Sequence, residues 1–151
     1  TGFYKAEVIL IKLLIENKDV RDKIIDQLKP EFFIDENMRK IANILFKRIN
    51  KGLDIKASDL FNLLDEESSR DLSRALMIKI NIEKQSLVDS LIKKVKEGYY
   101  KHSISEVLEQ IKRAELLGHR EEIIDLLSNY QKLKTEMENL NIHFTPGKGG
   151  A

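Results

Sequence analysis

The longest helical pattern in the sequence runs from Glu83 to Leu117, and its only residue that disfavours a helix is Gly98. A continuous helix of this length would extend roughly 50 Å at ~1.5 Å per residue. At ~100° per residue, its apolar side chains form two stripes that face different directions. The stripe before Gly98 consists of Val88, Leu91, Ile92, Val95 and Tyr99, and the stripe after it consists of Tyr100, Ile104, Val107, Ile111 and Ala114. The two halves of this helix are therefore expected to pack against different parts of the protein.

The second stripe has a matching partner in the last helical pattern of the chain. There the apolar residues are spaced alternately three and four apart, as in a coiled-coil seam: Ile123, Leu126, Tyr130, Leu133, Met137 and Leu140. A tight turn at Gly118 would place Ala114 opposite Ile123 and Tyr100 opposite Met137 in one antiparallel register. The sequence thus predicts a helical hairpin over residues 96–140. Residues 141–151, which lack the spacing of a phosphate-binding loop, are expected to form a flexible tail.

Residues 3–95 are expected to form a compact helical bundle. Apolar residues recur there at helical spacing, strand-like alternation is missing, and the whole chain contains only two prolines and seven glycines. Asp19 is expected to cap the second helix, Pro30 to end it, and Gly52 to stop the third. The expected fold is therefore all-α, with an N-terminal helical bundle joined by a long helix to a C-terminal antiparallel helical hairpin. Because the stripe changes side at Gly98, we expect a hinge there.

Composition excludes several classes of protein. Lys and Arg number 26 against 25 Asp and Glu, and hydrophobic residues make up 42%, which argues against a disordered or membrane protein. Binding to DNA through its phosphates would need a basic excess, so no direct nucleic-acid binding is expected, and Lys93-Lys94-Val95-Lys96 is interpreted as a solvated helix face. The chain has no cysteine, signal peptide pattern or apolar run near 18 residues, which fits a cytoplasmic location.

Candidate catalytic and metal-binding residues are few. The histidines His102, His119 and His143 are scattered, and none has a carboxylate and a second ligand at the spacing of a helical metal site. The acidic run Asp65-Glu66-Glu67 is interpreted as the negative charge that a helix N-terminus favours. We therefore expect no catalytic residue, no metal and no cofactor in this chain.

Residues 5–55 resemble two families of bacterial replication proteins, the N-terminal domain of the replicative helicase (DnaB-type) and the C-terminal domain of DNA primase (DnaG-type). The shared elements are Ala6-Glu7, Leu13-Leu14, Lys29-Pro30-Glu31-Phe32-Phe33, Met38-Arg39 and Gly52-Leu53-Asp54-Ile55. Two features favour the primase family. Residues Ser68 to Ile82 contain no glycine, where the helicase domain usually carries a Gly-Gly stretch, and residues 120–140 resemble the helix that ends the primase family. The resemblance covers roughly residues 5–140.

The resemblance to primase implies docking and no chemistry in this chain. The family's C-terminal domain binds the helicase N-terminal domain, recruits primase to the replication fork for RNA primer synthesis and stimulates the helicase. Its hairpin provides most of the binding surface and its bundle the stimulation, while the zinc-binding and polymerase domains would lie upstream, so we expect a fragment of a longer protein. The alternative is the scaffold domain of the helicase itself, acting by self-assembly into a ring collar. Direct binding of single-stranded DNA is a weaker possibility, because a basic groove with stacking aromatics is missing.

The seam leaves a set of residues near the hairpin turn without an internal partner, and we call this set the docking ridge. Four of its members are large aliphatics, and an apolar patch on a globular domain often marks an interface. The other three are polar neighbours that would form its rim. The ridge consists of Leu116, Leu117, Arg120, Ile124, Leu127, Ser128 and Gln131. The alternative interpretation is that isolated exposed leucines are common and carry no function.

Overall fold

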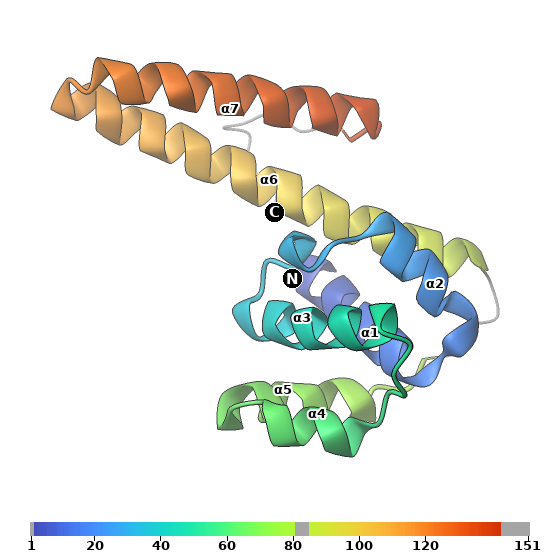
Figure 1. The fold of residues 1–151 in the computed structure, drawn as a ribbon. Helices are drawn as coiled ribbons and strands as arrows, with labels where there is room; N and C mark the ends of the chain where they lie inside the picture. The colour runs from blue at the N-terminus through green and yellow to red at the C-terminus, as the bar shows by residue number, and fades with distance from the viewer. Residues whose placement is uncertain (1, 81–84, 143–151) are drawn as a thin grey trace. The chain divides into compact units, whose positions relative to one another are not determined.

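The computed structural model describes residues 2–80 and 85–142, and every regular element in these two ranges is a helix (Figure 1). The all-α prediction is confirmed for this part of the chain. The elements are α1 (Gly2–Glu16), α2 (Lys18–Gln27), the short 3-10 helix η1 (Pro30–Phe32), α3 (Glu36–Asn50), α4 (Ala57–Leu63), α5 (Glu66–Met77), α6 (Gln85–Leu117) and α7 (Arg120–Asn139). Among these helices, none combines the length and the apolar character needed to span a membrane.

The chain divides into two compact units, Thr1–Lys96 and Glu97–Ala151, and α6 contributes to both. Helix α6 runs without interruption through Gly98, which lies two residues after the boundary between the units. A glycine in a helix interior costs roughly 1 kcal/mol relative to alanine, so this is the weakest backbone position of the long helix. The hinge at Gly98 stays a prediction.

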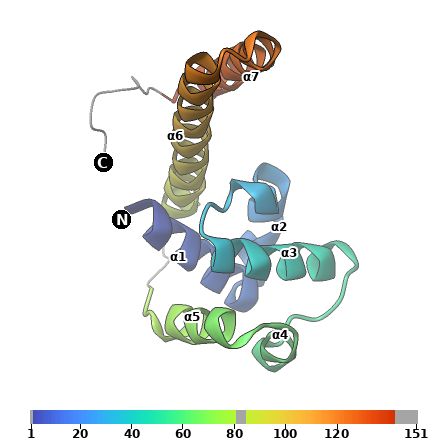
Figure 2. The same ribbon diagram turned by 90° about the vertical axis from the view of Figure 1, so that its left-hand side faces the viewer.

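Helix α1 is the centre of the first unit and contacts α2, α3 and α5 (Figures 1 and 2). Its sequence is apolar nearly all round, which is the pattern of a helix buried on most sides. Its buried apolar residues are Ala6, Val8, Leu10, Ile11, Leu13, Leu14 and Ile15. The same core includes Val88, Ile92 and Val95 from the first part of α6. Four residues of the first apolar stripe, Val88, Leu91, Ile92 and Val95, therefore pack in the core of the first unit, whereas Tyr99 belongs to the second unit.

The expected ends of α2 need correction. Asn17, not Asp19, caps the helix: Asn17 has extended backbone angles and its side-chain oxygen accepts a hydrogen bond from the Asp19 N–H at 3.0 Å. Asp19 falls in the first turn, where its negative charge still favours the helix. The helix also ends at Gln27, before Pro30. A proline disfavours helical backbone at the residue directly before it, and both that residue, Lys29, and Leu28 adopt extended angles. Pro30 instead begins η1.

The ends of α3 agree with the sequence. Asp35 caps its N-terminus by accepting a hydrogen bond from the Met38 N–H at 3.0 Å. Gly52 follows its C-terminus with φ +69°, a conformation that side chains disfavour, and the Leu53 N–H donates to the Arg48 carbonyl at 3.0 Å. This pair of features is a Schellman motif, which satisfies the last carbonyls of the helix.

In the second unit, α7 returns alongside the later part of α6 (Figures 1 and 2). The turn is another Schellman motif, in which Gly118 has φ +70° and the His119 N–H donates to the Ala114 carbonyl at 3.0 Å. The Tyr100 hydroxyl donates to the Glu136 carboxylate at 3.3 Å, next to its predicted partner Met137. Within this unit, the buried apolar residues of α6 and α7 are Tyr100, Ile104, Val107, Ile111, Ala114, Leu133 and Met137. On α7, the seam residues Ile123, Leu126 and Tyr130 are only half-buried.

The first two residues of the expected tail, Asn141 and Ile142, follow directly after α7 and are described by the structure. Asn141 has φ +57°, and the Ile142 N–H donates to the Met137 carbonyl at 3.0 Å, so these two residues close α7 with a third Schellman motif. Asparagine tolerates this left-handed conformation better than most residues do. Ile142 is buried and stands at the position of the motif that often makes an apolar contact with the helix. The rest of the predicted tail, 143–151, lies outside the described residues.

Candidate protein-interaction surfaces

Two of the sequence elements shared with both families, Ala6-Glu7 and Lys29 to Phe33, are connected in the structure by hydrogen bonds to the two residues that follow Phe33. Lys29 to Phe33 form η1 and its flanks, and Phe33 is fully buried with its ring edge-to-face against Phe46 at 6.3 Å. The carboxylate of Glu7, on α1, accepts hydrogen bonds from the backbone N–H groups of Ile34 at 3.1 Å and Asp35 at 3.2 Å. The Ala6-Glu7 element and the Phe32-Phe33 element are therefore two parts of a single structural feature.

The burial and the hydrogen bonds of the Glu7 carboxylate are features that the sequence analysis did not predict. The Glu7 side chain is 2% exposed, and burial raises its pKa to about 7, against the two backbone hydrogen bonds that stabilise the charged form. Asp35 raises the pKa further and Arg39 lowers it. The only signal in the sequence is a single acid at the start of the otherwise apolar face of α1. Glu7 ties α1 to the start of α3 and has the position of a structural group, not of a catalytic one.

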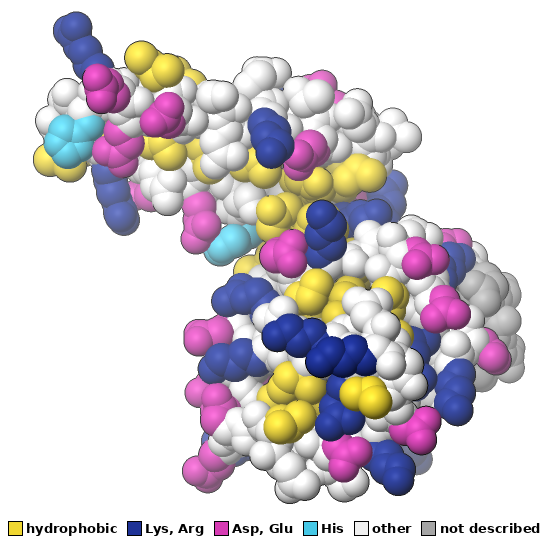
Figure 3. All heavy atoms as spheres, in the orientation of Figure 1, with side chains coloured by type: hydrophobic (Ala, Val, Ile, Leu, Met, Phe, Trp, Pro, Cys, Tyr) yellow, Lys and Arg dark blue, Asp and Glu magenta, His cyan; other side chains and the backbone are white. Residues whose placement is uncertain are grey.

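The apolar members of the docking ridge are strongly exposed. The exposed fractions are 86% for Leu116, 67% for Leu117, 66% for Ile124 and 50% for Leu127. Their polar neighbours Arg120, Ser128 and Gln131 are exposed as well. Figure 3 shows hydrophobic side chains on the outer side of α7 and near the α6–α7 turn. The exposure is what an interface requires, and the assignment of the ridge as an interface remains a prediction.

Helical geometry divides the ridge into two parts. Ile124 and Leu127 are three residues apart on α7, so at ~100° per residue their side chains lie about 60° apart on the same side of the helix. Leu116 and Leu117 are adjacent at the end of α6 and point about 100° apart, to different sides of its buried stripe. Ile124 and Leu127 therefore share one face of α7, whereas Leu116 and Leu117 do not share a face of α6.

The remaining candidate residues have structural explanations. His102 and His119 are exposed. His102 lies 3.2 Å from Glu106 within α6, and His119, the N-cap residue of α7, lies 3.2 Å from Glu122 in the first turn of that helix, whereas His143 is outside the described residues. Asp65 caps α5 through the Ser68 N–H at 2.8 Å, and this hydrogen bond lowers the pKa of its carboxyl group. Across residues 2–80 and 85–142, no group of three His, Cys, Asp or Glu side chains is arranged to hold a metal ion.

Comparison with known proteins finds similarity to a DNA primase. The DNA primase of Clostridium acetobutylicum (strain ATCC 824) is 26% identical to this chain over 145 residues, an alignment that covers 90% of the chain and 24% of the primase. The chain therefore spans about a quarter of the length of this relative. No protein-family model matches the chain. None of the solved structures matches it significantly. The similarity supports a primase-derived domain.

Proposed function

We propose that this chain is a non-catalytic interaction domain of a bacterial primase that binds the N-terminal domain of the replicative helicase. In this proposal it recruits primase to the replication fork for RNA primer synthesis and stimulates the helicase. The observation that carries the proposal is the similarity to a DNA primase over 90% of the chain but only 24% of the primase. An all-helical piece of this size leaves room in the longer protein for the domains that make primers.

The two units would divide the work of recruitment and stimulation. The hairpin of residues 96–140 would dock on the helicase through Ile124 and Leu127, with Leu116 and Leu117 beside them. Binding energy in protein interfaces usually concentrates in a few buried anchors surrounded by a polar rim, and Arg120, Ser128 and Gln131 would supply such a rim here. The bundle of residues 3–95 would carry the stimulating contacts. The partner is a protein, and no nucleic acid is needed for this step.

Titration calorimetry against the N-terminal domain of the cognate helicase tests the docking surface. Leu127 is 50% exposed, so Leu127→Asp should leave helical content nearly unchanged while weakening helicase binding by at least ~2 kcal/mol. Leu133 is 8% exposed and belongs to the seam, so Leu133→Asp is the matched variant that should disrupt the hairpin itself. Wild-type affinity in a folded Leu127→Asp protein would remove the ridge from the proposal.

The alternative, a scaffold domain of the helicase, makes a different prediction in the same experiment. Such a domain would assemble with itself into a ring and would have no separate affinity for the helicase N-terminal domain. Sedimentation of the wild-type chain distinguishes the two, because the primase proposal expects the 17.5 kDa chain to bind the helicase domain without forming a ring of its own. The similarity to a DNA primase is the observation that favours the first.

A further inference from the structure

A hollow beside the C-terminal end of α3 combines exposed aliphatic side chains with positive charge, and we call it the basic groove. Its volume is about 280 Å³, and it is lined by Ile44, Lys47, Arg48, Lys51, Leu53 and Leu63. Leu53 is 49% exposed and Leu63 is 58% exposed, although both lie beside a well-formed core. Figure 3 shows Lys and Arg side chains crossing this face of the first unit between groups of hydrophobic side chains.

Among the residues that the structure describes, the three cations of the basic groove have no acidic partner. None of Lys47, Arg48 and Lys51 forms an ion pair within the described ranges, and no carboxylate lines the groove. Basic residues in the last turn of α3 stabilise the helix through its dipole, which explains part of this charge. The helix dipole does not explain two exposed leucines next to that charge. An apolar floor under unpaired cations is complementary to an acidic ligand with an apolar side chain.

A second hollow lies on the other side of α3, and we call it the polar hollow. Its volume is about 540 Å³, and its lining is Ile25, Asp26, Leu28, Lys29, Pro30, Glu31, Asn43, Phe46, Lys47 and Asn50. Lys47 lines both hollows. At ~100° per residue, Asn43 and Asn50 project to one side of Lys47, and Ile44 and Arg48 project to the other. Lys47 therefore lies on the surface of α3 between the basic groove and the polar hollow.

We propose that this face of the first unit binds an extended acidic segment of a partner protein that crosses α3 over Lys47. One apolar side chain of the segment occupies the basic groove and a second occupies the polar hollow. A helix with its side chains is about 10 Å across. An extended segment in the polyproline II conformation covers about the same distance in three residues at ~3.1 Å each, and its side chains return to the same face after three residues. The two apolar anchors are therefore three positions apart in the segment. Its carboxylates pair with Lys47, Arg48 and Lys51.

The lining favours a peptide over a nucleic acid. Single-stranded nucleic acids are usually held by aromatic side chains on which the bases stack. The one aromatic residue of the two linings, Phe46, is 5% exposed and packs against Phe33. The floor of the basic groove is aliphatic, which suits a leucine-like anchor.

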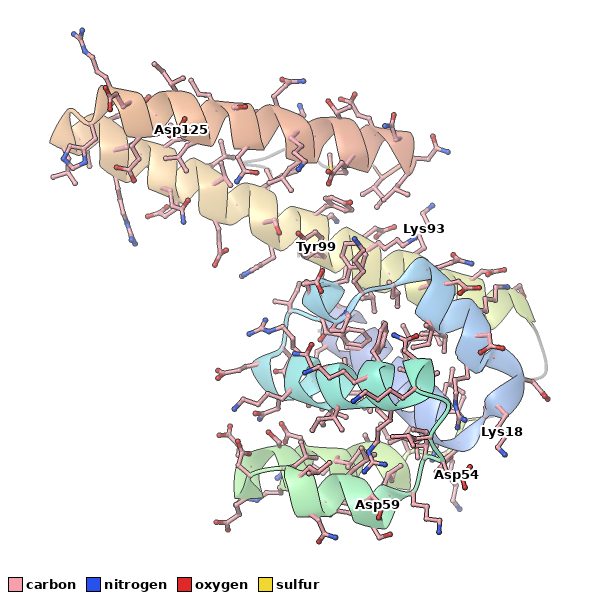
Figure 4. All side chains as sticks on the ribbon, viewed as in Figure 1. Lys18, Asp54, Asp59, Lys93, Tyr99 and Asp125 are labelled. Carbon is pink, nitrogen blue, oxygen red and sulfur yellow. The ribbon has the colours of Figure 1, made fainter. Side chains whose placement is uncertain are left out.

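Fluorescence anisotropy with the whole chain and a labelled synthetic probe tests the proposal. The probe is an acidic peptide of Asp and Glu with two leucines three positions apart, and its matched control has the same composition with the leucines adjacent. We expect the spaced probe to bind more tightly than the control and to lose affinity as salt rises. The charge reversal Arg48→Glu and the apolar change Leu63→Ser should each weaken binding by at least about tenfold. Lys18→Glu, an exposed lysine at the start of α2 that lines neither hollow, should leave it unchanged (Figure 4).

The other outcomes overturn the proposal. Equal binding of the spaced and adjacent probes would show that α3 is not straddled. Equal losses in Lys18→Glu and Arg48→Glu would show that only general positive charge is involved. A single-stranded oligonucleotide that displaces the probe at lower concentration than the unlabelled peptide would assign the face to nucleic acid. Because Leu53 and Leu63 are exposed, circular dichroism of each variant should match the wild type, and a variant that fails this check is replaced by Leu53→Ser.

Discussion

The two units of this protein differ in how many of their apolar residues are buried. In the first unit, α1 buries its apolar residues between Ala6 and Ile15 except the partly buried Ile9, together with apolar side chains from α2, α3, α4, α5 and the start of α6. In the second unit, α6 buries its stripe of five residues, but on α7 only Leu133 and Met137 are buried. Two helices with one seam cannot cover all their large apolar side chains. The unit with the smaller core therefore has the larger share of free apolar surface, which is where docking is expected.

The largest expected effect concerns separation of the units. A fragment of residues 1–95 should fold alone and unfold cooperatively on heating, because it contains the complete bundle core. A fragment of residues 96–142 has fewer than 50 residues and a single seam, and a domain that small rarely reaches more than about 3–5 kcal/mol of stability without a staple. We expect it to be weakly helical without its partner, as measured by circular dichroism melting of the two fragments.

Two results would change the comparison between the units. A cooperative transition of fragment 96–142 at the midpoint of the whole chain would show that the seam alone is a stable core. Tight binding of fragment 1–95 to the helicase domain would place the docking surface in the first unit. Leu133→Asp in the whole chain is the matched control, since it should remove the helical signal of the second unit and spare that of the first.

A smaller effect is expected in the pH dependence of the first unit. The pKa of Glu7 is about 7 in the folded protein against 4.5 for an ordinary glutamate, so the folded state binds more protons between these values. The contribution of Glu7 to the free energy of unfolding should therefore be largest below pH ~4.5 and should fall as the pH rises towards ~7. Glu7→Gln should abolish this dependence in urea unfolding of fragment 1–95. Glu31, an exposed glutamate of η1, is the control: Glu31→Gln should keep the pH dependence, and identical pH profiles for both variants would refute the assignment to Glu7.

The smallest effect is expected at Gly98. Gly98→Ala should stabilise the interior of α6 by up to ~1 kcal/mol. It should also narrow the range of distances between the two units. The chain has no cysteine, so spin labels can be placed uniquely at Lys18→Cys on α2 and Asp125→Cys on α7, two exposed positions in different units (Figure 4). Pulsed electron resonance should give a broad distance distribution that narrows in Gly98→Ala. One narrow distribution for both proteins would mean that no hinge operates there.

Sequence periodicity predicts most of the helices because each one buries a regular stripe. It also places Gly52 and Gly118 correctly, since a left-handed residue after a helix is usually glycine. The choice of cap for α2 fails because Asn17 and Asp19 are both good capping residues and only the backbone geometry separates them. Ile142 is missed because one apolar residue after an asparagine does not form a pattern, although its burial decides where α7 closes.

Some features of the candidate sites can also be predicted from the sequence, and others cannot. The exposed leucines of the docking ridge are predictable because they are what remains after the seam is paired. The hydrogen bonds of Glu7 are not, since its partners are backbone N–H groups 27 and 28 residues away and a backbone group has no signature in the sequence. The basic groove is missed for a similar reason: Leu53 and Leu63 come from a loop and a short helix that meet α3 only in the folded chain.

The hydrogen bonds between Glu7 and the start of α3 also bear on what a family resemblance can prove. They explain why the Ala6-Glu7 and Phe32-Phe33 elements occur together: the carboxylate secures the turn whose phenylalanine fills the core. Such residues report how a chain reaches its shape, so two proteins that share the shape will share them whatever each one binds. Evidence that distinguishes a primase domain from a helicase domain must therefore come from side chains that the core does not need.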